Sequence, residues 1–264
     1  MTFSATQQTK IEELLKQKIR RKLSNYSSES QESQSMPFHV RLLGKDRMAL
    51  FSFIQSLNTT LGTSVFEQVA AIVASPNFRR VVNQYREFDN TVSENAQVVI
   101  QEIIDNLRAA RETPDKAREI KKILDVAQTG TIKTIRRPRI DLFLESHDGT
   151  EYYFDLKTAK PNRDDIIGFK RKLLEWVAIR GSVNRDVKIF TGIGIPYNPY
   201  EPQPYDRWTF QGMFDLEREL KVGKEFWDFL GGKGTYEALL EIFEKVGIEL
   251  RPEIDQRFSA FTAQ

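Results

Sequence analysis

Hydrophobic residues recur at helical spacing through the first half of the chain. Apolar side chains return every three or four positions between Lys10 and Leu23, which predicts an amphipathic helix. The polar, serine-rich stretch over residues 24–35 then predicts a linker. The apolar face of the helix has two candidate partners, either the rest of this chain or a second copy that it would bind as a dimerisation arm. Packing within the chain is the commoner role, and both explanations stay open on the sequence.

The helical pattern continues from residue 36 to about residue 130, after which short alternating segments begin. Helices are expected at residues 66–74, 81–88, 98–110 and 115–127. Aromatic and branched residues predict strands at residues 139–145, 151–157 and 186–195. Further helices are expected at residues 164–180, 215–230 and 235–246, with Gly231 and Gly232 as a stop signal.

This order of elements predicts an α/β (α+β) fold, in which a central mixed sheet is flanked by helices and the N-terminal region is largely helical. We expect an N-terminal helix and linker over residues 1–35 and one domain over residues 36–264. Within that domain, residues 36–130 form a helical lead, residues 131–200 an α/β core and residues 201–264 a mainly helical part.

Composition narrows the chemistry that the chain can perform. It contains no cysteine and two histidines, so zinc–thiolate, iron–sulfur and multi-histidine sites are excluded. A metal ion would be held by oxygen ligands, which suits Mg²⁺, Mn²⁺ or Ca²⁺. The formal charge of +2 neither predicts nor excludes nucleic-acid binding. No signal peptide and no apolar run of membrane length is evident, so we expect a cytoplasmic protein without a membrane partner.

The strand at residues 151–157 carries an acid and a lysine side by side. Side chains alternate along a strand, so Asp155 and Lys157 project from the same face. Asp141 on the preceding strand joins them only if the connecting hairpin loop has an odd number of residues. A two-residue loop would turn its side chain to the opposite face.

The loop sequence favours the arrangement that brings Asp141 to the pair. A three-residue loop over His147-Asp148-Gly149 sets Ser146 opposite Thr150, and counting back sets Asp141 opposite Asp155. Such loops need a glycine in the left-handed conformation, and Gly149 stands at that position. Directly opposed Cβ atoms lie about 4.5–5.5 Å apart, so the two carboxylates could share one divalent ion.

Two carboxylates held this close repel each other unless a cation lies between them. A hard divalent ion would remove that repulsion, and Lys157 could then orient a water molecule toward a phosphodiester. An acid and a lysine two positions apart also occur by chance as a surface ion pair. On the residues alone, a metal-dependent nuclease site and a surface ion pair are both open.

A family resemblance adds to this interpretation. Pro138-Arg139-Ile140-Asp141 followed by Asp155-Leu156-Lys157 resembles the PD-(D/E)XK signature of many restriction endonucleases, although two residues separate Pro138 from Asp141 where the signature implies adjacency. Four further segments are similar to the restriction family typified by TdeIII and MjaII, over roughly residues 37–258: KTAKPN at 157–162, YNPY at 197–200, KVGKEFW at 221–227 and FLGG at 229–232.

The resemblance implies a type II restriction endonuclease with a restriction-endonuclease-like core. Such an enzyme would cleave double-stranded DNA at a short, G/C-rich, GGNCC-like palindrome, with Mg²⁺ as cofactor and Mn²⁺ able to substitute. Asp141 and Asp155 would bind the metal and Lys157 would complete the catalytic group. The expected partners are DNA, a second copy in a homodimer and a cognate DNA methyltransferase in a prokaryotic host.

The resemblance also implies a further acid. Nucleases of this superfamily often present a glutamate to the metal from a helix that precedes the strands, and Glu67 in the segment SVFE at residues 64–67 looks like that feature. Ser64 and Glu67 also have the spacing of a capping box at a helix start. Both explanations of Glu67 are open.

Basic and amide side chains around the expected centre are candidates for contacting DNA. Lys160, Asn162 and Arg163 lie just beyond the catalytic strand and are the candidates for reading bases, because arginine commonly reads guanine. Phosphate contacts would orient the protein without reading sequence. The full set is Arg137, Arg139, Lys160, Asn162, Arg163, Lys170 and Arg171. A repair or recombination nuclease of the same fold, or a non-catalytic DNA-binding module, is the alternative.

Overall fold

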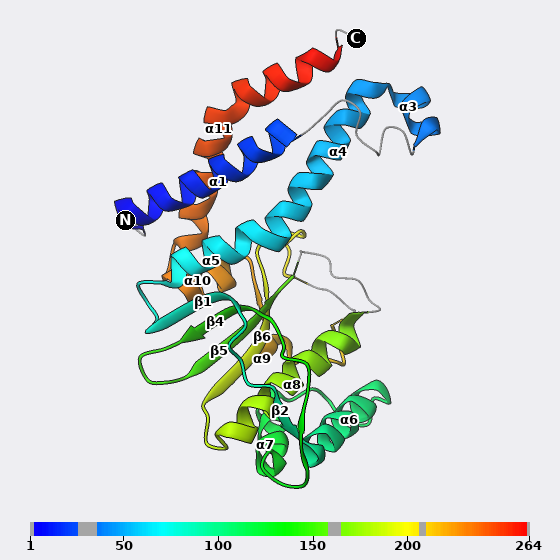
Figure 1. Cartoon of the computed structure of the whole chain (residues 1–264), viewed down its shortest axis with the longest axis vertical. Coiled ribbons are helices and arrows are strands. Elements are labelled where there is room, and N and C mark those ends of the chain that lie inside the picture. The colour runs from blue at the N-terminus through cyan, green and yellow to red at the C-terminus, as the bar shows by residue number, and fades with distance from the viewer. Residues whose placement is uncertain (1–2, 26–35, 158–164, 206–209, 263–264) are drawn as a thin grey trace. The chain divides into compact units, whose positions relative to one another are not determined.

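The computed structural model describes residues 3–25, 36–157, 165–205 and 210–262 (Figure 1). The chain forms two compact units, one from residues 1–72 and 233–264 and the other from residues 73–232. The first unit therefore contains both ends of the chain. The sequence analysis expected a different division, with a boundary between residues 35 and 36. The serine-rich segment at 26–35 lies outside the described residues.

The first unit is built from helices in its described part. They are α1 (Ala5–Asn25), α3 (Pro37–Leu43), α4 (Lys45–Thr60), the π-helical turn η1 (Leu61–Val65), α5 (Phe66–Ala74) and α11 (Thr235–Thr262). The apolar residues Ile11, Leu15 and Leu23 of α1 are buried, and α1 contacts α4 and α11. This confirms that the first helix packs within its own chain. Helix α11 runs well past the expected end at residue 246 and continues through Pro252.

The helical stretch from residue 45 to residue 74 passes through η1 without a break. Thr60, Leu61 and Phe66 all have right-handed helical backbone angles, so no helix begins at Ser64. The Ser64 hydroxyl accepts hydrogen bonds from Lys18 Nζ at 2.8 Å and from Gln68 Nε2 at 3.1 Å. The capping-box explanation of Ser64 and Glu67 is therefore wrong, because a residue inside a helix has no free N–H groups to cap.

The second unit contains a five-stranded mixed sheet in the order β1-β4-β5-β6-β7. Strand β4 pairs antiparallel with both β1 and β5, whereas β6 pairs parallel with β5 and with β7. The strands are β1 (Arg80–Tyr85), β4 (Ile140–Glu145), β5 (Glu151–Leu156), β6 (Ile189–Ile195) and β7 (Leu220–Val222). A second sheet pairs β2 (Thr91–Ser93) with β3 (Ile132–Thr134). The helices are α6 (Glu94–Arg108), α7 (Lys116–Val126), α8 (Ile166–Val183), α9 (Leu216–Glu219) and α10 (Lys224–Gly231).

The predicted fold class, a mixed α/β arrangement with a central sheet flanked by helices, is confirmed. Two helix predictions are wrong. Residues 81–88 were expected to be helical, but β1 occupies most of them and pairs with β4, which suits its adjacent valines. Residues 215–230 do not form one helix, because β7 separates α9 from α10 and extends the sheet beside β6.

Strand β5 sends alternate side chains to two separate apolar layers. Tyr153 faces α8, with its ring centroid 6.4 Å from that of Trp176. Phe154 faces the other way, toward Phe226 of α10 at 5.7 Å. Helices α6, α7 and α8 gather on one side of the sheet in Figure 1. Asp155 follows the alternation and belongs to the face that α8 covers.

The β4–β5 hairpin has the register that the loop sequence predicts. Leu142 pairs with Phe154, and continuing this register by one residue sets Asp141 opposite Asp155. At the other end, the Ser146 N–H donates to the Thr150 carbonyl at 3.0 Å, which closes a three-residue loop. Gly149 has a φ of 81°, as the left-handed position of this loop requires. The three-residue loop is confirmed.

A Gly149→Ala substitution is expected to lower the free energy of unfolding by about 1 kcal/mol, because alanine disfavours the left-handed conformation. A Cβ at this position would meet no atom within 4 Å, so the cost is conformational and not steric. Gly149→Asn should lose less, because asparagine tolerates this conformation. Urea unfolding measures both, and equal losses for the two variants would contradict the explanation.

Candidate active site

The two aspartates lie opposite each other where the β4–β5 hairpin meets the edge of the apolar layer. The Asp155 side chain has no exposed surface, and that of Asp141 is 14% exposed. The Leu156 N–H donates to Oδ2 of Asp141 at 2.9 Å, which fixes the orientation of that carboxylate. The hairpin alone therefore brings both acids together, through strand pairing that the loop length sets.

Two lysines contact the buried carboxylate of Asp155. The Nζ atom of Lys157 lies 2.7 Å from Oδ2, and the ammonium of Lys172 donates to Oδ1 at 2.5 Å. Lys157 comes from the end of the same strand, as the alternation predicted. Lys172 comes from α8, and the sequence analysis did not connect it with the aspartates.

Helix α8 runs antiparallel to β5, and two ion pairs join them. Arg180 Nε donates to Glu151 Oε2 at 2.8 Å near the start of the strand, and Lys172 reaches Asp155 near its end. Eight helical residues rise about 12 Å, and four strand residues span about 13 Å. The two ion pairs therefore match in spacing and hold the helix in register with the strand. This match of spacings is the signal that could have identified Lys172 from the sequence.

The two aspartates have opposite pKa shifts. Burial, and then the nearby charge of Asp155, raises the pKa of Asp141 to about 6. Burial also acts to raise the pKa of Asp155, but the ammonium groups of Lys157 and Lys172 outweigh it and lower that pKa. Asp155 is thus the more acidic member of the pair, and Asp141 is the member that loses its proton near pH 6.

The pair fits a hard divalent cation. Oδ2 of Asp155 is buried and accepts no hydrogen bond of regular geometry within the described part of the chain, although the Lys157 ammonium is close. Two carboxylates side by side suit Mg²⁺, which binds one or two carboxylates and several waters. No group of three His, Asp or Glu side chains that could hold a metal occurs among the described residues.

Comparison with known proteins decides the class of the chain. Residues 4–247 match the family described as "Type II restriction endonuclease, HinfI". The chain belongs to this family. Type II restriction enzyme HgiBI from Herpetosiphon aurantiacus is 27% identical over 276 residues, which cover 97% of this chain and 99% of the relative. Type II restriction enzyme HgiCII from the same organism is 28% identical, over 86% of this chain and 83% of its own.

A third relative is type II restriction enzyme MjaII from Methanocaldococcus jannaschii, 26% identical over 91% of this chain and 69% of the relative. The HinfI-family endonuclease is therefore a site-specific deoxyribonuclease, and DNA is its substrate. Family membership favours the restriction class over the repair nuclease considered from the sequence. Within the described residues, no helix of the endonuclease is long and apolar enough to cross a membrane.

Glu67, the candidate third acid, lies in the first turn of α5 and is 3% exposed. It belongs to the helical unit, whereas the two aspartates belong to the sheet unit. Its role as a metal ligand of the endonuclease stays a prediction.

The candidate DNA contacts differ in their exposure. Arg137 and Arg139 are exposed in the segment before β4, and Arg139 Nε lies 3.8 Å from Oδ1 of Asp141. Arg171 of α8 is half-buried and donates to Gln101 Oε1 at 2.6 Å. The candidates for reading bases, Lys160, Asn162 and Arg163, lie outside the described residues. Contact of these residues with DNA stays a prediction.

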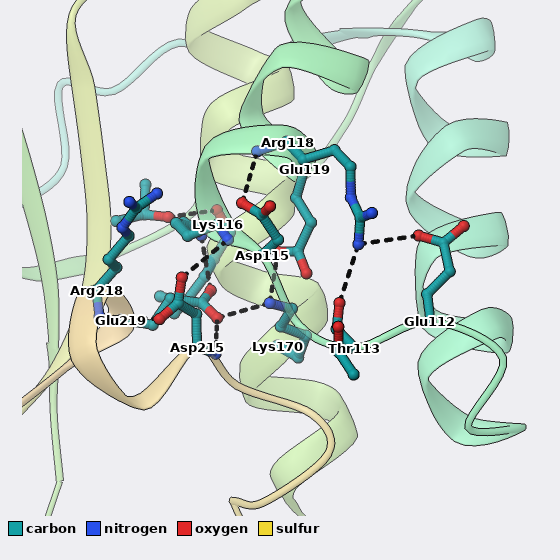
Figure 2. A network of polar contacts seen from close by, with 12 residues as sticks. Glu112, Thr113, Asp115, Lys116, Arg118, Glu119, Lys170, Asp215, Arg218 and Glu219 are labelled. Atoms are coloured by element: carbon teal, nitrogen blue, oxygen red, sulfur yellow. Dashed lines mark hydrogen bonds and ion pairs between the residues drawn. The ribbon is translucent and has the colours of Figure 1, made fainter.

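Lys170 requires a correction, because its side chain is fully buried. Its ammonium donates to Glu119 Oε2 at 2.5 Å and to Glu219 Oε2 at 2.6 Å, and Lys116 donates to Glu219 Oε1 at 2.8 Å (Figure 2). We call Lys116, Glu119, Lys170 and Glu219 the buried charge cluster. It joins α7, α8 and α9, so Lys170 has no surface with which to contact DNA.

The burial of Asp141, together with its repulsion by Asp155, predicts that Asp141→Asn stabilises the metal-free endonuclease. The folded-state pKa of Asp141, about 6, lies above the ordinary unfolded value, so the wild type loses stability as the pH rises from about 4 to about 6. The variant cannot lose that proton. We expect it to be about 1–3 kcal/mol more stable than the wild type at pH 8 in EDTA, and this difference to shrink toward pH 4.

Urea unfolding at both pH values, with a chelator present, measures this difference. An asparagine oxygen can still accept the hydrogen bond from Leu156, so the comparison isolates the charge. A variant no more stable than the wild type at pH 8 would show that neither burial nor the charge of Asp155 disfavours the ionised form of Asp141.

Proposed function

We propose that this endonuclease hydrolyses both strands of DNA at a short, G/C-rich palindrome of the GGNCC type, with Mg²⁺ held by Asp141 and Asp155. One observation carries the catalytic part: the β4–β5 register sets two carboxylates opposite each other, and Oδ2 of the buried Asp155 lies 2.7 Å from the ammonium of Lys157. Mn²⁺, which also prefers oxygen ligands, is expected to substitute for Mg²⁺. The GGNCC-type site rests on the family resemblance in the sequence.

Each residue has a separate task in this proposal. Asp155 and Asp141 bind the ion, which when bound lowers the pKa of a water molecule and stabilises charge on the phosphate. Lys157 orients the attacking water and offsets negative charge on the phosphoryl oxygens in the transition state. Its ammonium lies 4.7 Å from the centre of the Phe169 ring, which restricts the conformations of the lysine stem. The water oxygen bonds to phosphorus as the bond to one ester oxygen breaks.

A palindromic target implies two catalytic centres related by two-fold symmetry. A homodimer with one centre for each strand meets that need. In a prokaryotic cytoplasm, a DNA methyltransferase that modifies the same sequence would protect the host chromosome. Arg137, Arg139 and Arg171 are the described candidates for contacting the DNA, together with Lys160, Asn162 and Arg163. Glu67 is the candidate for a further metal ligand.

Digestion of phage DNA tests the proposed function. The purified protein is incubated with phage DNA and Mg²⁺, Mn²⁺ or EDTA, and the fragment ends are sequenced. Discrete fragments whose ends share a GGNCC-like palindrome, formed only with a metal, are expected. Ends that share a different sequence would overturn the proposed site alone. Intact DNA with every metal, salt and substrate would overturn the proposed catalytic centre.

A further inference from the structure

Of the two lysines described above that contact the Asp155 side chain, Lys172 is the one that lies outside the β4–β5 hairpin segment. Its ammonium lies 2.5 Å from Oδ1, on the carboxylate oxygen that Lys157 does not contact. The Asp155 side chain is fully buried, and the Lys172 side chain is 34% exposed. The contact therefore joins a buried acid to a lysine whose stem extends to the surface.

The two oxygens of Asp155 have different surroundings. Oδ1 accepts a hydrogen bond from Lys172, whereas Oδ2 accepts none of regular geometry from the described residues and lies beside Lys157. When a hydrogen-bond donor fixes one oxygen of a carboxylate, the orientation of the second oxygen is fixed as well. Carboxylates that bind metals are usually held in this way by a hydrogen bond to the second oxygen.

The position of Lys172 is itself strongly determined. Its ammonium lies 5.1 Å from the ring of Trp176, one helical turn further along α8, and that tryptophan is fully buried. Two residues before Lys172, the side chain of Lys170 enters the buried charge cluster and ties α8 to α7 and α9 (Figure 2). At the other end of the contact with β5, Arg180 pairs with Glu151. Helix α8 is thus anchored on both sides of Lys172.

We propose that Lys172 is a positioning residue for the metal site, which holds Oδ1 of Asp155 so that Oδ2 is presented to the divalent ion. The proposal rests on the metal site of the proposed function. It assigns Lys172 no contact with the reacting atoms.

An opposing effect gives the proposal a clear test. The positive charge of Lys172, beside Asp155, also repels a metal ion. A lysine that only neutralised the acid would therefore weaken metal binding. Its removal would then tighten that binding. A lysine that orients the carboxylate has the opposite effect, because its removal leaves Oδ1 without the donor that fixes it. The sign of the change in metal affinity separates the two roles.

The test measures Mn²⁺ affinity of the full chain without DNA, at pH 8, by electron paramagnetic resonance. Lys172→Met keeps most of the apolar stem over Trp176 and removes the donor, whereas Lys172→Arg keeps a charged donor. We expect Lys172→Met to weaken Mn²⁺ binding by about 10–100-fold and Lys172→Arg to recover most of the loss. Lys121→Met is the matched control, because Lys121 lies on exposed α7 surface, 76% accessible, and pairs with Asp125. Its affinity should equal that of the wild type.

Melting curves without metal establish that each variant is folded, and Lys172→Gln replaces Lys172→Met if the latter does not fold. Asp155→Asn tests the metal site itself. If Asp155→Asn loses Mn²⁺ but Lys172→Met binds it as tightly as the wild type, or more tightly, the positioning role is overturned and the proposed metal site stands. If the wild type binds no Mn²⁺, the proposed metal site is overturned, and the role of Lys172 with it.

Discussion

Replacing Asp155 by asparagine is expected to lower the rate of DNA cleavage by at least about 10³-fold. The substitution keeps the size of the side chain and an oxygen that can accept a hydrogen bond from Lys172, but it removes the charge that we propose binds the metal. Loss of a metal ligand of this kind costs several kcal/mol of transition-state stabilisation, and about 4 kcal/mol corresponds to about 10³-fold. Single-turnover cleavage of a plasmid with one site measures the effect.

Asp105→Asn is the matched control for this experiment. Asp105 lies on exposed α6 surface and accepts a hydrogen bond from Gln101 Nε2, so the same chemical change occurs there away from the aspartate pair. The control should cleave at the wild-type rate. Melting temperatures in EDTA distinguish a loss of chemistry from a loss of fold. An Asp155→Asn protein that is folded and cleaves at a rate near that of the wild type would exclude Asp155 as a metal ligand.

The second large effect is expected from Lys170→Met, on stability. Lys170 lies between Glu119 and Glu219, and all three side chains are at least 95% buried. Removing the lysine leaves the negative charges of two buried carboxylates with less positive charge nearby. Breaking a buried ion pair in this way costs about 3–5 kcal/mol. Burial already raises the pKa of Glu119, so this acid is the one expected to take up a proton in the variant. Urea unfolding at pH 8 measures the loss.

Two comparisons test whether the loss of stability in Lys170→Met comes from the buried charges. Lys121→Met, on exposed α7 surface, removes a lysine from an ion pair with Asp125 and should cost less than about 1 kcal/mol. Unfolding of Lys170→Met at pH 5 should show a smaller deficit than at pH 8, because a protonated Glu119 needs no counter-charge. A deficit that is the same at both pH values, or no larger than that of the control, would contradict the account of the cluster.

The aspartate pair was predictable because its geometry is local. Asp141 and Asp155 belong to one hairpin, and the loop around Gly149 sets which residues of the two strands face each other. Strand alternation then brings Lys157 to the same face. These steps need only the residues between positions 139 and 157. The family resemblance was confirmed by the match to the HinfI family.

The residues that the sequence did not reveal act through contacts between distant segments. Lys170 and Lys172 belong to one run of three basic residues, and such a run is usually solvated. In the fold, Lys170 is buried against Glu119 and Glu219, whereas Lys172 reaches Asp155. Which lysine faces which partner depends on how α8 lies against β5, α7 and α9. That orientation follows from packing and leaves no local pattern.

The two errors in secondary structure have a similar origin. Strand β1 lies at one edge of the sheet and β7 at the other, each with one neighbour in that sheet. Strand β7 has three residues, too few for alternation to be visible, and pairing with β6 holds it extended. The valines of β1 fit a helical pattern as readily as a strand until β4 is present to pair with them.

The chain passes between its two compact units twice, after residue 72 and after residue 232. A ribosome makes residues 73–232 before α11, and α11 is the helix that packs against α1 and α4 in the helical unit. The sheet-bearing unit can therefore fold while the chain is still being synthesised. Helix α1 must wait for α11 to complete its contacts, and until α11 emerges the apolar face of α1 is less covered and more open to chaperones and to aggregation. In a growing chain of this endonuclease, the hairpin that carries Asp141 and Asp155 is thus complete before the helices that precede it in sequence have all their partners.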